Sequence, residues 1–352
     1  MIQTLLLALL VSFLSVLLIT PFTIKIIKKF GLIDDPSTHK HPAIIHTKPI
    51  PRGGGLPIYI GILVAMLIFI PLNFQFGMVL FAGGLVVLVG LLDDRYDISP
   101  YLRFGMNIVS ASIVVFSGIT IPFITDPLGP GILLFSNWSI SIGDQLFVLP
   151  LAQIFAIIWI VWVMNMLNWS KGVDGQMPGI AAVSAIIIGI AALRFGVIDQ
   201  SSVNTSIFAF IIAGAAIGFL VYNFYPAKIF PGYSATILGF ALGVVSILSS
   251  VKLATAILVM GIPAADAIFT IVRRVASKKS PFWHDRGHLH HLLLKKGISQ
   301  RKIALFYWGM SLLLGMIALT LSSKGKIFAI ILVTVLVIGG ILALRYITNE
   351  RK

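Results

Sequence analysis

The residues able to do chemistry gather in five short polar stretches between long apolar ones. The five stretches are residues 31–55, 92–103, 165–176, 223–236 and 280–291. They carry paired carboxylates, histidines, glycine turns and most of the nearby basic residues. Adjacent carboxylates need a compensating cation, and histidine acts as an acid, a base or a phosphate ligand near neutral pH. This combination suits phosphoryl transfer, in which a protein mainly positions groups and neutralises charge.

The second stretch has three carboxylates, Asp93, Asp94 and Asp97, within five residues at the end of an apolar segment. Charges next to hydrocarbon are costly, so a cluster there indicates function. Mg²⁺ binds a few carboxylates together with substrate phosphates, and such a cluster suits it. The alternative is a solvated helix end with salt bridges to Arg95 and Arg103.

The first stretch places Lys48 and Arg52 just before three glycines at 53–55. Glycines at a helix start let backbone N–H groups approach an anion closely. The two basic side chains would add charge-assisted hydrogen bonds. A flexible loop whose charges only set the membrane topology explains this stretch equally well.

The third stretch combines Asn165 and Asn168, three residues apart on one helix face, with a turn. Gly172 and Gly175 permit a tight turn that presents Asp174. Asparagines at the end of an apolar span favour a packed, functional face over an ordinary helix end. The fourth stretch has aromatic residues that could stack on a base, although aromatic residues are also common at membrane interfaces.

The fifth stretch contains four histidines close to Asp285 and Arg286. They could bind phosphate or a transition metal, and we favour the phosphate because no histidine has helical i, i+4 spacing together with a clean carboxylate partner. Just before this stretch, Asp266 lies inside an apolar span, which makes it a functional candidate. The alternative is that it pairs with Arg273 or Arg274.

The elements that must position these stretches are membrane helices. The 352 residues are 58% hydrophobic and only 11% charged, against about 25% charged in soluble domains. We predict an all-α polytopic integral membrane protein of about eleven transmembrane helices, forming a single domain over residues 1–352. The predicted spans are 2–22, 54–72, 77–92, 104–124, 150–168, 179–195, 205–222, 235–250, 252–271, 304–322 and 327–346. Alternating residues around Gly143-Asp144 predict a small β-hairpin on the outer face.

The basic residues set the orientation. All but four of the 26 Lys and Arg fall on one side; the exceptions are Arg194, Lys252, Lys324 and Lys326. The positive-inside rule makes the basic side cytoplasmic, with the N-terminus outside and the C-terminus inside the plasma (inner) membrane. This distribution explains the net charge of +14 without a nucleic-acid partner. The absence of cysteine excludes disulfides, thiol nucleophiles and cysteine metal sites.

In order along the chain, these motifs resemble the polyprenyl-phosphate N-acetylhexosamine-1-phosphate transferase family. The matching segments are Pro49–Gly54, Asp93-Asp94-x-x-Asp97, Asn165-x-x-Asn168, Gly172-x-Asp174-Gly175, Pro226–Phe230 and Asp285–His291. Eleven spans with an external N-terminus are more similar to the WecA-like branch than to the ten-span MraY branch. The resemblance covers most of the chain, from about residue 31 to residue 302.

The resemblance implies a reaction and its partners. A UDP-N-acetylhexosamine would give its sugar-1-phosphate to a membrane polyprenyl (undecaprenyl) phosphate and release UMP, in cell-envelope polysaccharide biosynthesis. Family members use Mg²⁺. A homodimer is an arrangement that the sequence leaves open.

The resemblance also implies residue roles. Asp93 would deprotonate or orient the lipid phosphate with help from Asp94, and Asp174 would line the nucleotide site. The expected catalytic residues are Asp93, Asp94, Asp174 and His290, with Asp94 and Asp174 also as metal ligands. The expected substrate-binding residues are Lys48, Arg52, Asn165, Asn168, Lys171, Lys228, Phe230, Arg286, His288 and His291.

The chain departs from the family pattern at two acidic positions. Lys171 stands where the family has the first Asp of Asp-Gly-x-Asp-Gly, and Tyr233 stands where the family has its expected magnesium-binding Asp. One interpretation is a catalytically inactive relative that binds lipid or nucleotide as a scaffold. The other is a working transferase in which the Lys171 ammonium supplies positive charge, and we favour it because both changes act in the same electrostatic direction. A transporter ranks last, because few polar residues lie at mid-membrane.

Overall fold

The computed structural model of the protein describes residues 1–37, 46–126, 131–135, 138–142, 145–194, 199–249, 253–283 and 285–349. Three features of the sequence lie outside these residues: the segment His39–His41, the turn Gly143-Asp144, and His284.

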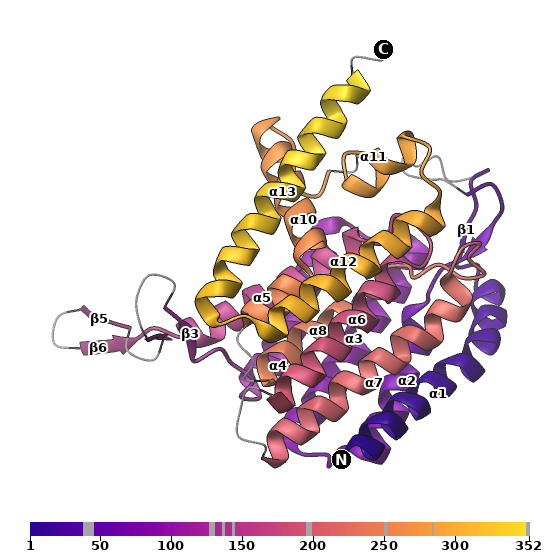
Figure 1. Cartoon of the computed structure of the whole chain (residues 1–352). Coiled ribbons are helices and arrows are strands. Elements are labelled where there is room, and N and C mark those ends of the chain that lie inside the picture. Colours follow the sequence, from indigo (N-terminus) through magenta and orange to yellow (C-terminus); the bar gives the residue numbers. More distant parts are fainter. Residues whose placement is uncertain are drawn as a thin grey trace.

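Helices dominate the described chain (Figure 1). They are α1 (Ile2–Lys29), α2 (Gly55–Phe69), α3 (Phe74–Tyr96), α4 (Pro100–Phe116), α5 (Leu151–Trp169), α6 (Gln176–Arg194), α7 (Gln200–Asn223), α8 (Thr236–Leu248), α9 (Leu253–Val259), α10 (Gly261–Ala276), α11 (Leu289–Lys295), α12 (Gln300–Thr320) and α13 (Ser323–Asn349). The strands are β1 (Ile33–Asp34), β2 (Ile50–Pro51), β3 (Phe123–Thr125), β4 (Ile132–Leu134), β5 (Ser139–Ile142) and β6 (Gln145–Val148).

The apolar helices confirm an all-α polytopic membrane protein. Within the described residues, seven helices are long and apolar enough to cross a membrane, or eight if one bent pair counts as a single span. Three shorter apolar helices, α2, α4 and α8, lie where further spans were predicted. The start of α1 and the end of α13 lie at opposite ends of the bundle (Figure 1).

Close helix packing holds the centre of the bundle. Helix α7 packs between α1 and α6, and much of its surface is buried. A Cβ atom added at Gly214 would come within 2.2 Å of the Leu9 carbonyl oxygen of α1, so only glycine allows this approach. Small residues at helix contacts are typical of membrane bundles, where close packing replaces the hydrophobic driving force.

The predicted single span 252–271 is wrong in one respect, because it is broken. Helices α9 and α10 meet at an angle of 83° around Met260. Helix α10 begins at Gly261, and Pro263 in its first turn lacks the N–H needed to continue the helix ladder from α9. The bend redirects α10 and carries Asp266 toward the polar loops.

Short strands complete the fold. The predicted pairing of the strands around Gly143-Asp144 is confirmed by β5 and β6, which pair from Ser139↔Val148 to Ile142↔Gln145. The outer side of the membrane stays a prediction for this hairpin. Strands β3 and β4 form a second hairpin that the sequence pattern did not predict. Strands β1 and β2 pair Asp34 with Ile50, which fixes the first polar loop beside the glycine run.

Candidate active site

Side chains from all five polar stretches line one cavity of about 480 Å³. The predicted site residues that line it are Arg52, Asp93, Asn165, Asn168, Lys171, Asp174, Phe230, His288, His290 and His291. Four predicted residues are not in its lining. Lys48, Lys228 and Arg286 are exposed, and Asp94 is buried behind a loop.

Asp93 forms a buried ion pair with Arg103. Helix α3 ends just beyond it, and α4 begins at Pro100, so Arg103 lies one turn into the next helix. Its Nη1 atom lies 3.0 and 2.9 Å from the two carboxylate oxygens of Asp93. The predicted salt bridge to Arg103 is confirmed. Solvation of the cluster holds only for Asp97 at the helix end, which is exposed, because Asp93 is only 4% exposed.

Asp94 organises the loop between α7 and α8. Its carboxylate accepts hydrogen bonds from the backbone N–H groups of Tyr233 and Ser234, at 2.7 and 3.3 Å. The Ser234 hydroxyl donates a third bond at 3.0 Å. The Arg52 guanidinium lies 3.8 Å away. Asp94 therefore holds the backbone of this loop against α3, one layer behind the cavity wall.

The two positions that depart from the family pattern meet in this wall. The Lys171 ammonium donates to the Gly232 carbonyl oxygen at 2.9 Å and lies 5.8 Å from the centre of the Tyr233 ring. The Arg103 guanidinium lies 5.0 Å from the same ring, and the Asn107 side chain donates to the Tyr233 hydroxyl. Both contacts with the ring have the geometry of cation–π interactions.

Burial changes the ionisation of this pair. It lowers the pKa of Lys171 to about 8, although the nearby Asp94 carboxylate opposes the shift. Burial raises the pKa of Tyr233 to about 12. At pH 7 the site therefore carries an ammonium ion beside a neutral phenol.

The histidines form another part of the cavity lining, at the start of α11. The rings of His288 and His290 are stacked with centroids 5.5 Å apart, and those of His290 and His291 lie 4.3 Å apart. Burial lowers the pKa of His290 and, with the charge of His288, lowers that of His291 to about 4. A Cβ at Gly172 would lie 1.8 Å from His290 Nε2, so this glycine is required for the turn to approach the histidines.

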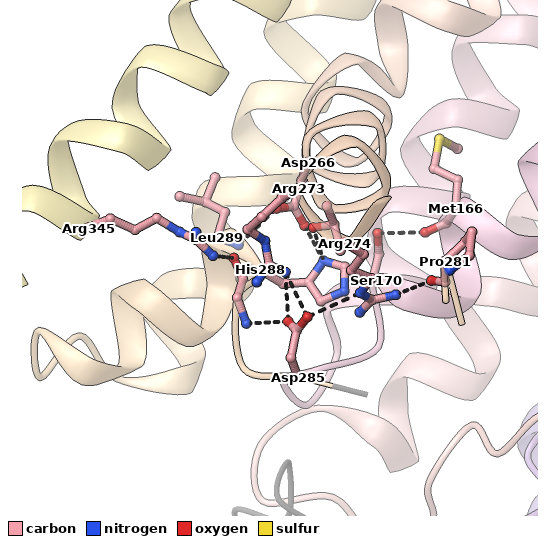
Figure 2. Close-up of polar contacts among 12 residues, drawn as sticks. Met166, Ser170, Asp266, Arg273, Arg274, Pro281, Asp285, His288, Leu289 and Arg345 are labelled. Carbon is pink, nitrogen blue, oxygen red and sulfur yellow. Dashed lines mark hydrogen bonds and ion pairs between the residues drawn. The ribbon is translucent and has the colours of Figure 1, made fainter. Parts of the chain in front are cut away.

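Asp266 fixes His288. Its Oδ2 atom lies 2.8 Å from His288 Nδ1, and its Oδ1 atom accepts the Leu289 N–H at 2.9 Å (Figure 2). The predicted functional importance of Asp266 fits this contact, but pairing with Arg273 or Arg274 is wrong. A carboxylate at Nδ1 sets which ring nitrogen carries the proton and leaves Nε2 available to the cavity.

Arg273 and Arg274 instead form ion pairs with Asp285 (Figure 2). Arg273 Nη2 lies 2.8 Å from each of its carboxylate oxygens, and Arg274 Nε lies 3.1 Å from one of them. Burial alone would raise the pKa of Asp285, but these arginines and the Gly287 N–H together hold it well below its usual range. This cluster anchors the loop before α11 to α10, and so positions the histidines.

Asp174 joins the third stretch to the fourth. Its carboxylate accepts the Ala227 N–H at 3.0 Å, and its own N–H donates to Gln300. Burial raises the pKa of Asp174. The next residue, Gly175, donates its N–H to Asn223, whose side chain also bonds the Ile229 carbonyl. These bonds hold residues 226–230 at the rim of the cavity.

Sequence reasoning missed several residues of the cavity lining. They include Asp34, His46, Asn223, Arg274 and Trp283. Asp34 reaches the site through the β1–β2 pairing and lies 3.9 Å from Arg52. Its position within a matching polar stretch was the only available clue, whereas the pairing of strands two residues long has almost no sequence signature.

The carboxylates do not form a ready site for Mg²⁺. Across the part of the chain that the structure describes, no three His, Asp or Glu residues are grouped so that they could hold a metal ion. The two expected ligands differ in position, since Asp94 lies behind the wall with three hydrogen bonds and Asp174 binds the Ala227 N–H. Asp93 is engaged by Arg103 through both oxygens. These residues do not fit a preformed metal centre, and the use of Mg²⁺ stays a prediction from the family resemblance.

The geometry thus defines a multi-pass membrane protein with a cavity lined by carboxylates, histidines and basic side chains, and sequence comparison identifies its family. The profile of Glycosyl transferase family 4 matches residues 76–250. The chain is 29% identical over 339 residues to a probable undecaprenyl-phosphate N-acetylglucosaminyl 1-phosphate transferase of Bacillus subtilis, covering 94% of this chain and 88% of the relative.

Two further relatives agree. Identity is 30% over 312 residues to the decaprenyl-phosphate N-acetylglucosaminephosphotransferase of Mycolicibacterium smegmatis, covering 80% of this chain and 73% of the relative. Identity is 28% over 295 residues to the undecaprenyl-phosphate alpha-N-acetylglucosaminyl 1-phosphate transferase of Escherichia coli K12, covering 80% and 74%. The chain belongs to Glycosyl transferase family 4.

Proposed function

We propose that this protein transfers N-acetylhexosamine-1-phosphate from a UDP-sugar to a membrane polyprenyl phosphate and releases UMP. The observation that carries the proposal is the convergence of five distant polar stretches on one cavity at the end of the apolar helices. Its volume of about 480 Å³ falls within the range of small-molecule sites. The named activities of similar proteins, matched over most of the chain, support the same reaction.

The reaction is a substitution at phosphorus. An oxygen of the polyprenyl phosphate attacks the sugar-bearing phosphorus of the UDP-sugar and forms a new P–O bond. The bond from that phosphorus to the oxygen bridging the two phosphates breaks, and UMP leaves with this oxygen and the electron pair. With a lipid phosphate dianion, no proton is gained or lost.

Cations in the cavity wall would stabilise this reaction. Arg52, Arg103, Lys171 and Arg274 all line the cavity. The charge that develops on the transferring phosphoryl oxygens needs preorganised donors of this kind. Arg274 is held by Asp285 and Arg103 by Asp93, so both point in fixed directions.

The acids and histidines would position the two substrates. Asp93 would orient the lipid phosphate through Arg103, and would take the proton from a lipid phosphate monoanion. His290 and His291 would donate hydrogen bonds to the diphosphate as largely neutral imidazoles, in keeping with the lowered pKa of each. His288, whose Nδ1 faces Asp266, would border the diphosphate beside them. Asp174 would lie on the nucleotide side.

Asn165 and Asn168, which also line the cavity, would share the nucleotide side with Asp174. Phe230 packs edge-on against His46 and would border the nucleotide there. The exposed Lys48, Lys228 and Arg286 would attract the anionic substrates rather than bind them in the cavity.

The membrane placement follows from charge. We place the cavity on the cytoplasmic side of the plasma (inner) membrane, with the N-terminus outside and the C-terminus inside. There the protein would meet a soluble nucleotide sugar and the headgroup of a membrane lipid at the same interface. Its product would enter cell-envelope polysaccharide biosynthesis.

The test is UMP release by the purified protein in nanodiscs that contain polyprenyl phosphate. We expect release with UDP-N-acetylglucosamine or another UDP-N-acetylhexosamine, and none when the lipid phosphate is omitted. Lys28→Met serves as a control, because Lys28 is exposed at the end of α1 and outside the cavity lining. If no UDP-sugar yields UMP, with or without Mg²⁺, the protein is not this transferase, and the scaffold interpretation takes its place.

A further inference from the structure

Lys171 is the feature of the cavity that the expected chemistry does not explain. It lies two residues after the end of α5, and its ammonium group donates a hydrogen bond to the Gly232 carbonyl oxygen in the loop before α8. An ammonium has three hydrogens, so this bond leaves up to two for a ligand in the cavity. The residue is thus a fixed positive charge at the position where five polar stretches meet.

The surrounding acids do not neutralise Lys171 through a direct ion pair among the described residues. Asp93 is bonded to Arg103, and Asp94 accepts three hydrogen bonds from Tyr233 and Ser234. Their charges still favour the ammonium form of Lys171, while burial and the nearby Arg52 disfavour it. The ammonium therefore keeps its charge, and no carboxylate of the described residues occupies it through an ion pair. A group that binds phosphate needs both properties.

Tyr233 completes the arrangement. Two cations lie near its ring, with Arg103 at 5.0 Å and Lys171 at 5.8 Å from the ring centre. The hydroxyl is held by Asn107, so the ring cannot turn freely. An aromatic ring stabilises nearby cations through its quadrupole. Unlike an aspartate, the neutral tyrosine offers no charged oxygen as a metal ligand. Tyr233 thus favours a resident cation at this place over a bound metal ion.

We infer that the Lys171 ammonium, backed by the Tyr233 ring, is the built-in cation that neutralises the substrate diphosphate, so that turnover does not require a divalent metal ion. This inference rests on the proposed function. In the substitution described above, Lys171 keeps its proton and donates hydrogen bonds to diphosphate oxygens as UMP leaves. The carboxylate arrangement supports the same conclusion, because the acids that would hold a metal are already bonded to protein donors.

The experiment compares four forms of the full-length protein in nanodiscs: wild type, Lys171→Met, Lys171→Arg and the control Lys28→Met. Two quantities are measured in EDTA and in excess Mg²⁺, namely UMP release and the dissociation constant of UDP. UDP is the binding probe because it presents the diphosphate without the sugar. Thermal unfolding of each variant shows whether it is folded.

We expect wild type and Lys28→Met to keep at least about half of their activity in EDTA. A charge-assisted hydrogen bond contributes about 1.5–3 kcal/mol, so Lys171→Met should weaken UDP binding in EDTA by roughly 10- to 100-fold. UMP release should fall by at least as much. Lys171→Arg should keep part of the binding because it keeps the charge, which distinguishes lost charge from a damaged fold.

Two results would overturn the inference. One is complete loss of wild-type activity in EDTA with recovery in Mg²⁺. The other is UDP binding by folded Lys171→Met in EDTA that equals that of wild type. If no form releases UMP under any condition, the proposed function fails by itself, and the UDP measurement still decides whether Lys171 holds a diphosphate.

Discussion

The two walls of the cavity differ in what they would offer to the proposed diphosphate. The histidine wall is made of buried imidazoles, of which His288 is held in place by Asp266, while Asp285 ties the loop before them to α10. The lysine wall offers the positive charge of the Lys171 ammonium, which lies beside the Tyr233 ring. In the proposed reaction one wall would orient the diphosphate through imidazole groups and the other would neutralise its charge, and substitutions can separate these contributions.

The largest effect is expected where a buried charge loses its partner. Asp93→Asn removes the carboxylate from Arg103 inside the protein and also removes the proposed contact with the lipid phosphate. Loss of one partner from a buried pair destabilises by about 3–5 kcal/mol. UMP release should fall by roughly 10²- to 10⁴-fold. Near-normal turnover in a stable Asp93→Asn protein would remove Asp93 from the reaction.

The histidine wall is tested by Asp266→Asn. An amide at Nδ1 no longer favours one tautomer of His288, so a fraction of molecules would present the wrong nitrogen to the substrate. We expect kcat to fall by about 10- to 100-fold with a small change in KM, since misplacement of a donor acts on the transition state. A purely structural role would instead lower thermal stability and leave kcat unchanged in the folded fraction.

The lysine wall is tested by restoring the family pattern with the double change Lys171→Asp and Tyr233→Asp. The substitution replaces a cation and a ring with two carboxylates, a ligand type that suits Mg²⁺. The ratio of activity in Mg²⁺ to activity in EDTA should rise by at least roughly tenfold over wild type, because Mg²⁺ must then supply the charge that Lys171 supplied. An unchanged ratio would show that the lysine wall has no part in metal dependence.

The smallest effect is expected from pH. Burial lowers the pKa of Lys171 to about 8, and the groups that face it are Asp94 and Asp93, which favour the ammonium, and Arg52 and Arg103, which disfavour it. The ammonium is present below this pKa and is lost as the pH rises through it. UDP binding in EDTA should therefore weaken several-fold between about pH 7 and about pH 9.

The same titration in Lys171→Met should lack this decline. A decline of equal size in that variant would assign it to another group. Below pH 7, protonation of His291 should have little effect until about pH 4, where its pKa lies.

Hydropathy predicted most of the fold because membrane helices must satisfy their own backbone hydrogen bonds, so long apolar stretches have few alternatives. The convergence of the polar loops followed from their common side of the membrane. The sequence did not predict which side chains form hydrogen bonds with one another inside the site. Asp93 and Asp94 are neighbours in sequence, yet one faces the cavity and the other binds the loop of Tyr233 and Ser234 behind it.

Such choices depend on helix rotation and tertiary contacts that spacing alone does not fix. Asp266 illustrates the point, because the break at Met260 turns α10 and gives its carboxylate to His288 rather than to an arginine in the same helix. The contact between Lys171 and Tyr233 was also invisible in the sequence, although their joint departure from the family pattern pointed to a shared cause.

Mass spectrometry of the lipids after incubation with a panel of UDP-sugars tests the central claim most directly. The account predicts a polyprenyl diphosphate bearing one N-acetylhexosamine, in amounts equal to the UMP formed, from wild-type protein in nanodiscs. Unmodified polyprenyl phosphate with every UDP-sugar tried, from folded protein that binds UDP, would contradict it.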